Sequence, residues 1–198
     1  MLRAKQLLFI TVLACLLSGC TGTSAPDTVA VPRRHAYPRI ELPDSAFTEV
    51  SAGAGNLTIG ISKASTIALR GYGKGNSGFI DVAYPGFNSS IYFTVTPVTP
   101  ATAGEVIDNR VERMGLNLGG AEAELLEFDT PAGFECKVLV SRGEISTPVQ
   151  FIATDGASLV VSGAAFVRDA SPSAADSIAP VVGMLRRDII HALSTMHR

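Results

Sequence analysis

The spacing between apolar residues changes along this chain, and this change limits the possible folds more than any other feature of the sequence. Apolar and polar residues alternate over residues 90–98, where Ile91, Phe93 and Val95 are separated by tyrosine and threonine. Such alternation is typical of a strand with one buried face. Strands are also predicted over residues 57–62, 65–69 and 79–84, with 57–62 and 65–69 paired across a short link.

The first helix is predicted where the apolar spacing changes to three and four residues. Thr102-Ala103-Gly104-Glu105 has the pattern of a capping box, in which the threonine hydroxyl and the glutamate carboxylate bond to free N–H groups. Gly119-Gly120 is expected to end the helix. The residues that we expect on its buried face are Ile107, Val111, Met114 and Leu118.

Four more strands and a second helix complete the predicted order. Asp176 or Ser177 is expected to cap this helix, with Pro180 in its first turn. Helices that are segregated from antiparallel strands predict an α+β layered domain. The predicted strands cover residues 121–128, 134–141, 148–153 and 158–167. The predicted buried face of the helix is Ile178, Val182, Leu185, Ile189 and Met196.

The first twenty residues have the parts of a lipoprotein signal peptide. Arg3 and Lys5 form a basic region, and residues 7–17 form an almost unbroken apolar run. A run of about ten residues is too short to span a bilayer of about 30 Å as a helix. Leu17-Ser18-Gly19-Cys20 then has the form of a bacterial lipobox. We therefore expect cleavage between Gly19 and Cys20 and acylation of the Cys20 thiol.

Acylation at Cys20 would attach everything that follows to a membrane outside the cytoplasm. Two or more acyl chains hold a protein stably, because each buried methylene contributes about 0.8 kcal/mol. Residues 21–36 are rich in small and polar residues and predict a flexible tether that reaches about 20–24 Å on average. The chain is thus divided into a signal peptide at 1–19, the lipidated cysteine and tether at 20–36, and a single globular domain at 37–198.

Charge and motifs argue against several classes of function. Loss of the signal peptide removes two basic residues and no acidic one, so the formal net charge falls from −2 to about −4. Such a chain lacks the basic stripe of a nucleic-acid-binding protein. It carries no familiar catalytic or metal-ligand motif, and no metal or cofactor is expected. Cys136 lies in an apolar stretch and is expected to pack in the core.

Several short segments together carry a family resemblance. They begin at Tyr37 (YPRIELP), Tyr84 (YPGFN), Ile107 (IDNR), Val149 (VQFIATD), Ser162 (SGAA), Asp176 (DSIAPV) and Arg187 (RDI). In this combination the chain resembles the gliding-motility lipoprotein GldD family from about Tyr37 to its C-terminus. It departs from the family pattern at Ser162, where an arginine before Gly-Ala is usual.

The resemblance implies a lipid-anchored component of gliding motility that is linked to the type IX secretion machinery, with no catalytic reaction and no cofactor. The strand order and the final helix are also similar to the Mog1/PsbP fold, an α/β/α sandwich used mainly for binding or assembly. The domain would face the periplasm from the outer or the inner membrane, bound to the bilayer through Cys20 and to protein partners. The expected partner-contact residues are Arg39, Pro85, Phe87, Arg110, Gln150, Asp155, Asp176 and Asp188.

A second hypothesis is an envelope lipoprotein that binds or remodels a ligand, with or without catalysis, and has no part in motility. Its site would lie at the glycine-rich residues 71–78, near Asp81 or Asp155. This segment lacks the spacing of a phosphate-binding loop and is more typical of a hairpin loop. Asp81, Asp108, Asp155 and Asp188 could meet in space, although solvated or capping roles are expected for them.

Overall fold

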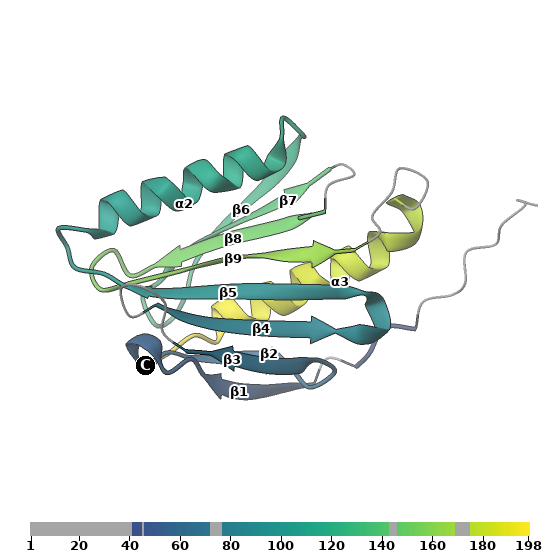
Figure 1. The fold of residues 1–198 in the computed structure, drawn as a ribbon, viewed down its shortest axis with the longest axis horizontal. Helices are drawn as coiled ribbons and strands as arrows, with labels where there is room; N and C mark the ends of the chain where they lie inside the picture. The colour runs from purple at the N-terminus through teal and green to yellow at the C-terminus, as the bar shows by residue number, and fades with distance from the viewer. Residues whose placement is uncertain (1–40, 45, 72–76, 143–145, 169–174) are drawn as a thin grey trace, which may run out of the picture. The chain divides into compact units, whose positions relative to one another are not determined.

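A seven-stranded antiparallel sheet lies at the centre of the residues that the computed structural model describes, which are 41–44, 46–71, 77–142, 146–168 and 175–198 (Figure 1). Its strands are β3 Thr66–Arg70, β4 Gly78–Tyr84, β5 Ser89–Pro97, β6 Ala123–Asp129, β7 Glu135–Ser141, β8 Val149–Thr154 and β9 Leu159–Val167. Two meanders, β3 to β5 and β6 to β9, meet where β5 pairs with β9, which gives the order β3-β4-β5-β9-β8-β7-β6.

Alternation along the strands separates the two faces of this sheet. In β5, Ile91, Phe93 and Val95 are buried on one face, while Tyr92 and Thr94 are half-buried on the other. β4 shows the same alternation. The predicted strands of the main sheet are therefore confirmed, with ends that differ by one or two residues.

A separate two-stranded antiparallel sheet is formed by β1 Phe47–Ser51 and β2 Thr58–Ser62. The predicted pairing of residues 57–62 with 65–69 is therefore wrong, because β2 pairs with β1 and β3 pairs with β4. β2 is almost wholly buried, whereas β3 is mostly exposed at the edge of the main sheet, so the two strands belong to different layers. β1 is absent from the predicted strands because its apolar residues, Phe47 and Val50, are three positions apart and do not alternate with polar ones.

The first predicted helix is confirmed as α2 Ala103–Leu118. Gly119 ends it in the left-handed conformation, with φ of 57° and its N–H donating to the carbonyl of Leu116. The predicted capping box is wrong. The Thr102 hydroxyl makes no cap bond and instead accepts the backbone N–H of Thr99 at 3.0 Å, which ties it to the preceding turn.

The face that α2 turns toward the sheet also differs from the prediction. Met114 is buried and Ile107 is partly buried, as expected, but Val111 is 48 % exposed. The helix instead turns Arg110 toward the sheet and hydrogen-bonds to it through Asn117. Apolar spacing misses this rotation because the aliphatic stem of arginine packs as an apolar residue does.

The second helix, α3 Ala175–Ser194, lies on the opposite face of the main sheet (Figure 1). Its predicted buried face is confirmed at Leu185 and Ile189, and at Met196 just beyond its end. The predicted start is wrong, since the helix already includes residues 176 and 177 and holds Pro180 in its second turn. Ile178 and Val182 are partly buried against the same core.

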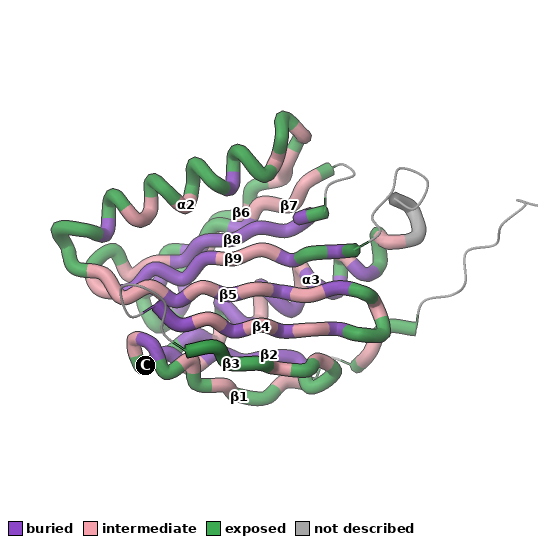
Figure 2. Tube along the Cα trace, viewed as in Figure 1, coloured by how far each residue is buried: buried purple, intermediate pink, exposed green. Residues whose placement is uncertain are grey.

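The two helices differ in how much they bury, since most of α2 is exposed or intermediate (Figure 2) whereas α3 carries many buried residues. The larger apolar cluster joins α3, β2 and the inner face of the main sheet, and it contains Cys136, whose burial raises the pKa of the thiol to about 12. The smaller cluster, under α2, consists of Met114, Ile152 and Val160. An α+β fold with an antiparallel sheet between two helices is thus confirmed, as is the core position of Cys136.

Candidate functional site

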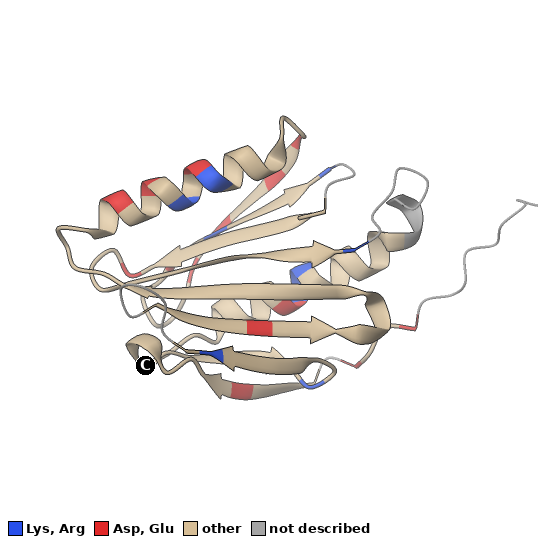
Figure 3. Cartoon of the chain, in the orientation of Figure 1, with Lys and Arg blue, Asp and Glu red and all other residues tan. Residues whose placement is uncertain are grey.

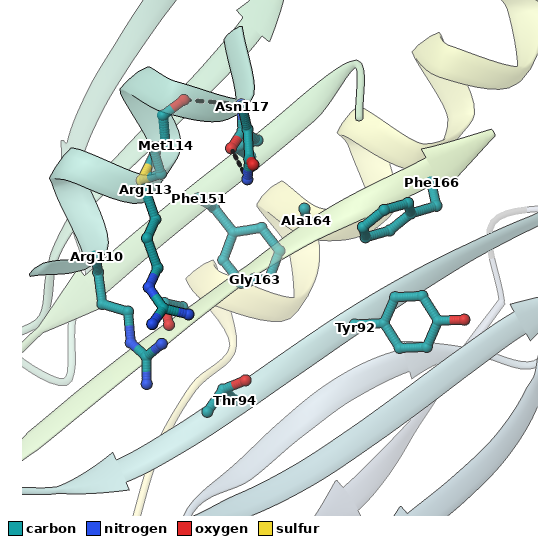
Figure 4. A pocket seen from close by; sticks show the side chains of 12 residues that line it. Tyr92, Thr94, Arg110, Arg113, Met114, Asn117, Phe151, Gly163, Ala164 and Phe166 are labelled. Atoms are coloured by element: carbon teal, nitrogen blue, oxygen red, sulfur yellow. Dashed lines mark hydrogen bonds between the residues drawn. The ribbon is translucent and has the colours of Figure 1, made fainter. Parts of the chain in front are cut away.

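A groove with a volume of about 300 Å³ lies between α2 and the outer face of β5 and β9 (Figure 4). α2 packs over β8 and β9 and leaves the neighbouring outer face of β5 uncovered, so the groove follows the border between the covered and the open part of the sheet. The helix side of the groove is formed by Arg110, Arg113, Met114 and Asn117. The sheet side includes Tyr92, Thr94, Ser162, Ala164 and Phe166.

Strand register produces the floor of the groove. Thr94 lies opposite Ser162, and Tyr92 lies opposite Ala164, so small side chains on β9 leave space beneath the helix. The rings of Tyr92 and Phe166 meet edge to face at 5.3 Å and form one end. Gly163 lies between the two small residues, and a Cβ there would collide with the Tyr92 carbonyl oxygen and the ring of Phe151.

Arg110 and Arg113 give the groove its charge. Neither arginine has an acidic partner among the described residues, and the Nε of Arg110 is buried without a hydrogen-bond partner. Burial, and next the positive charge of Arg113, lowers the pKa of the Arg110 guanidinium. Because an unpaired buried donor costs about 1–3 kcal/mol, this arrangement works against stability.

Local sequence explains why the arginines are unpaired. On a helix, side chains pair with those three and four positions away. The residues at these positions around Arg110 and Arg113 are apolar or asparagine, apart from the two arginines themselves. The acidic residues of α2, which are Glu105, Asp108 and Glu112, lie on its exposed surface (Figure 3).

Gln150 fastens the C-terminal half of α2 to the sheet. Its side chain is 1 % exposed, and its Oε1 accepts a hydrogen bond from Asn117 Nδ2 at 3.1 Å. Its Nε2 donates to the carbonyl of Met114 at 3.3 Å. Through these two bonds Gln150 links α2, which forms the wall of the groove, to β8 of the sheet.

Of the expected partner-contact residues whose side chains the structure describes, only Arg110 and Gln150 come together in this groove. Pro85 and Phe87 lie in the short 3₁₀ helix Pro85–Phe87 between β4 and β5. Asp176 lies in the first turn of α3, but its side chain is not among those that the structure describes. Gly19, Cys20 and Arg39 lie outside the described residues.

Asp188 belongs to a buried contact between α3 and β4. Its carboxylate is 4 % exposed and accepts hydrogen bonds from the hydroxyl of Tyr84 at 2.8 Å and from Arg187 Nε at 3.1 Å. Burial, with the charge of Asp188 as the next cause, raises the pKa of Tyr84 well above its ordinary value. This network joins core elements and does not open into the groove.

Asp155 organises the turn between β8 and β9. It accepts backbone N–H groups from residues 157, 158 and 159 and pairs with Arg198 at 2.6 Å. Burial opposes ionisation, but these bonds and that of the Ser158 hydroxyl outweigh it, so the pKa of Asp155 is lowered. Asp81 is paired with Arg70 across β3 and β4 at 2.8 Å. The four candidate carboxylates therefore do not converge on one site, since Asp108 is exposed on α2.

The second hypothesis placed a site at residues 71–78, of which 72–76 lie outside the described residues. A cavity of about 210 Å³ beside this segment is lined by Ala52, Leu69, Arg70, Gly71 and Gly78. Polar groups from different elements do not converge among these lining residues.

No group of three potential metal ligands occurs in the part of the chain that the structure describes. No helix within the same ranges is both long and apolar enough to cross a membrane.

Sequence reasoning reached Arg110 and Gln150 through the family segments and missed Tyr92, Arg113 and Phe166. The available signal was the pair of arginines one turn apart without an acidic neighbour at helical spacing.

A comparison with curated proteins gives no match. The family model for the gliding motility lipoprotein GldD matches residues 27–197. The chain therefore belongs to the gliding motility lipoprotein GldD family and is a motility-related lipoprotein of the cell envelope.

Proposed function

We propose that this protein is a lipid-anchored, periplasm-facing component that assembles or stabilises the gliding machinery and the associated type IX secretion machinery without catalysing a reaction. The observation that carries this proposal is the family match over residues 27–197, which begins seven residues after the lipobox cysteine, Cys20. An acylated Cys20 and a short tether would keep the domain close to one membrane.

The use of the carboxylates supports a role without catalysis. Asp81, Asp155 and Asp188 are each engaged in an ion pair, a turn or a buried hydrogen bond that has a structural purpose. General acid–base chemistry needs such groups at a cleft, within reach of a substrate. The groove under α2 instead presents arginines and aromatic rings, which suit binding.

Gene deletion and complementation in the source organism test the proposal. We expect deletion to abolish surface spreading and to reduce export of type IX cargo. The wild-type gene should restore both, whereas Cys20→Ala should restore neither and should release the protein from membranes. Cys136→Ala is the matched control, because that thiol is buried in the core and should leave anchoring unchanged.

Normal spreading and normal cargo export in the deletion strain would refute the role in motility and secretion. Normal spreading with the Cys20→Ala protein, at wild-type abundance, would refute the need for the anchor.

A further inference from the structure

We propose that the groove between α2 and the outer face of β5 and β9 binds a carboxylate group of a protein partner, held by Arg110 and Arg113. The inference rests on the proposed assembly role, which requires a partner. It adds the position of the contact and the chemistry of the bound group.

The guanidinium groups of the two arginines indicate which chemical group the groove would bind. An arginine offers five N–H donors in a planar fork that matches the two oxygens of a carboxylate. Arg110 and Arg113 are one helical turn apart on the groove side of α2, and no acidic side chain of the described residues lines the groove. The buried Nε of Arg110 is a donor without an acceptor. A carboxylate entering the groove would supply that acceptor and neutralise two neighbouring positive charges.

The shape of the groove favours a side chain of a protein over a free metabolite. About 300 Å³ is at the lower end of the volumes that enclose a small ligand. The groove also reaches Tyr92 on β5 and Phe166 on β9, and Phe166 is 37 % exposed beside the tyrosine ring. An extended segment could therefore place an acidic side chain against the arginines and an apolar neighbour against these rings.

Titration with short peptides tests the proposal on the full mature lipoprotein in detergent micelles. The probe is an acetylated, amidated tripeptide of glutamate, phenylalanine and glutamate, and its control carries glutamine in place of both glutamates. We expect saturable binding by calorimetry, with a shift of the Arg110 Nε–H resonance. The glutamine peptide should bind at least about tenfold more weakly, and added salt should weaken the glutamate peptide.

Variants localise the binding. Arg110→Gln and Arg113→Gln should each weaken the glutamate peptide by about tenfold. Arg142→Gln, which removes an exposed arginine that does not line the groove, should leave it unchanged. Thermal unfolding must show that all three variants fold, and Arg113→Gln, at an exposed position, keeps the test valid if Arg110→Gln does not fold.

Four results would overturn the inference. They are no binding of the glutamate peptide, equal binding of both peptides, equal weakening by Arg142→Gln, and acetate or phosphate binding as tightly as the peptide, which would indicate a site for a small free anion. The result is separable from the deletion experiment. Peptide binding in a protein whose deletion leaves motility intact would refute the proposed function alone, and a motility defect without peptide binding would refute this inference alone.

Discussion

The two faces of the main sheet differ in how their charged groups are paired, since Arg187 on α3 pairs with Asp188 whereas Arg110 on α2 has no acidic partner among the described residues. On the α3 face, the carboxylate of Asp188 is buried but accepts a hydrogen bond from Tyr84, and most of the apolar core surrounds it. On the α2 face, Arg110 is partly buried with a free Nε, over a cluster of only three buried apolar residues in the described chain. Satisfied polar groups fix a structure, whereas unsatisfied ones reduce its stability and remain available to a ligand.

The main sheet therefore separates the residues that stabilise the fold from those available for binding. The α3 face supplies the packing, and the α2 face, covered by a helix along only part of its width, tolerates a groove. Substitutions on the α3 face should therefore act mainly on the free energy of unfolding. Those on the α2 face should act mainly on binding.

The largest expected effect comes from cavities in the two clusters. Leu185→Ala, in the larger cluster, should lower the free energy of unfolding by about 4 kcal/mol, because a fully buried side chain leaves a void. Met114→Ala, under α2, should lower it by about 2 kcal/mol, since its cluster is small. Urea unfolding followed by circular dichroism measures both. Equal losses would show that the two faces contribute equally to stability.

The next effect concerns the hydroxyl groups of two tyrosines on opposite faces. Tyr84→Phe should destabilise the fold by about 2–3 kcal/mol, because it removes a hydrogen bond to the buried carboxylate of Asp188. Tyr92→Phe, at the groove, should change the free energy of unfolding by less than about 0.5 kcal/mol. Urea unfolding of both variants measures the two changes in the free energy of unfolding. A larger loss for Tyr92→Phe than for Tyr84→Phe would contradict the prediction.

The sequence predicted the elements well because strand and helix periods are local properties. It predicted Ile91 and Phe93 as inward-facing and Leu185 as core, and the structure confirms both. The pairing of β2 with β3 was wrong because closeness along the chain does not determine the layer in which a strand is buried. That choice depends on tertiary contacts of Ile59 and Ile61 with the core.

The groove depends on relations that no local pattern contains. Its floor exists because Thr94 and Ser162, far apart in the sequence, become neighbours in the β5–β9 register. Its charged wall depends on the rotation of α2, where apolar spacing favoured Val111 over Arg110. The resemblance marked Arg110 and Gln150 as candidates, but only the structure shows that they share one site.

A smaller, pH-dependent effect on stability is expected at Asp155, whose carboxylate accepts backbone N–H groups and pairs with Arg198. Its folded-state pKa is lowered, so its contribution to stability is present above the unfolded pKa of about 3.9 and is lost as the pH falls through the folded-state value. Asp155→Asn should therefore destabilise the fold by about 1–2 kcal/mol at pH 7 and by less near pH 3. Thermal unfolding of both proteins across this range measures the difference. A difference in stability that does not change with pH would mean that the charge of the Asp155 carboxylate does not stabilise the fold.

The smallest effect on stability is expected at Arg110, and its direction is the sharpest test of the comparison. Arg110→Met keeps an apolar stem and removes the unpaired buried Nε, so the free energy of unfolding should stay the same or rise by up to about 1 kcal/mol. Urea unfolding measures the change, with Arg142→Gln as the control for loss of an exposed positive charge. Destabilisation by more than about 1 kcal/mol would mean that Arg110 has a structural role. An Arg110→Met protein that is stable but no longer binds the glutamate peptide would instead show that the charge of Arg110 serves binding. The fold would then gain no stability from this charge.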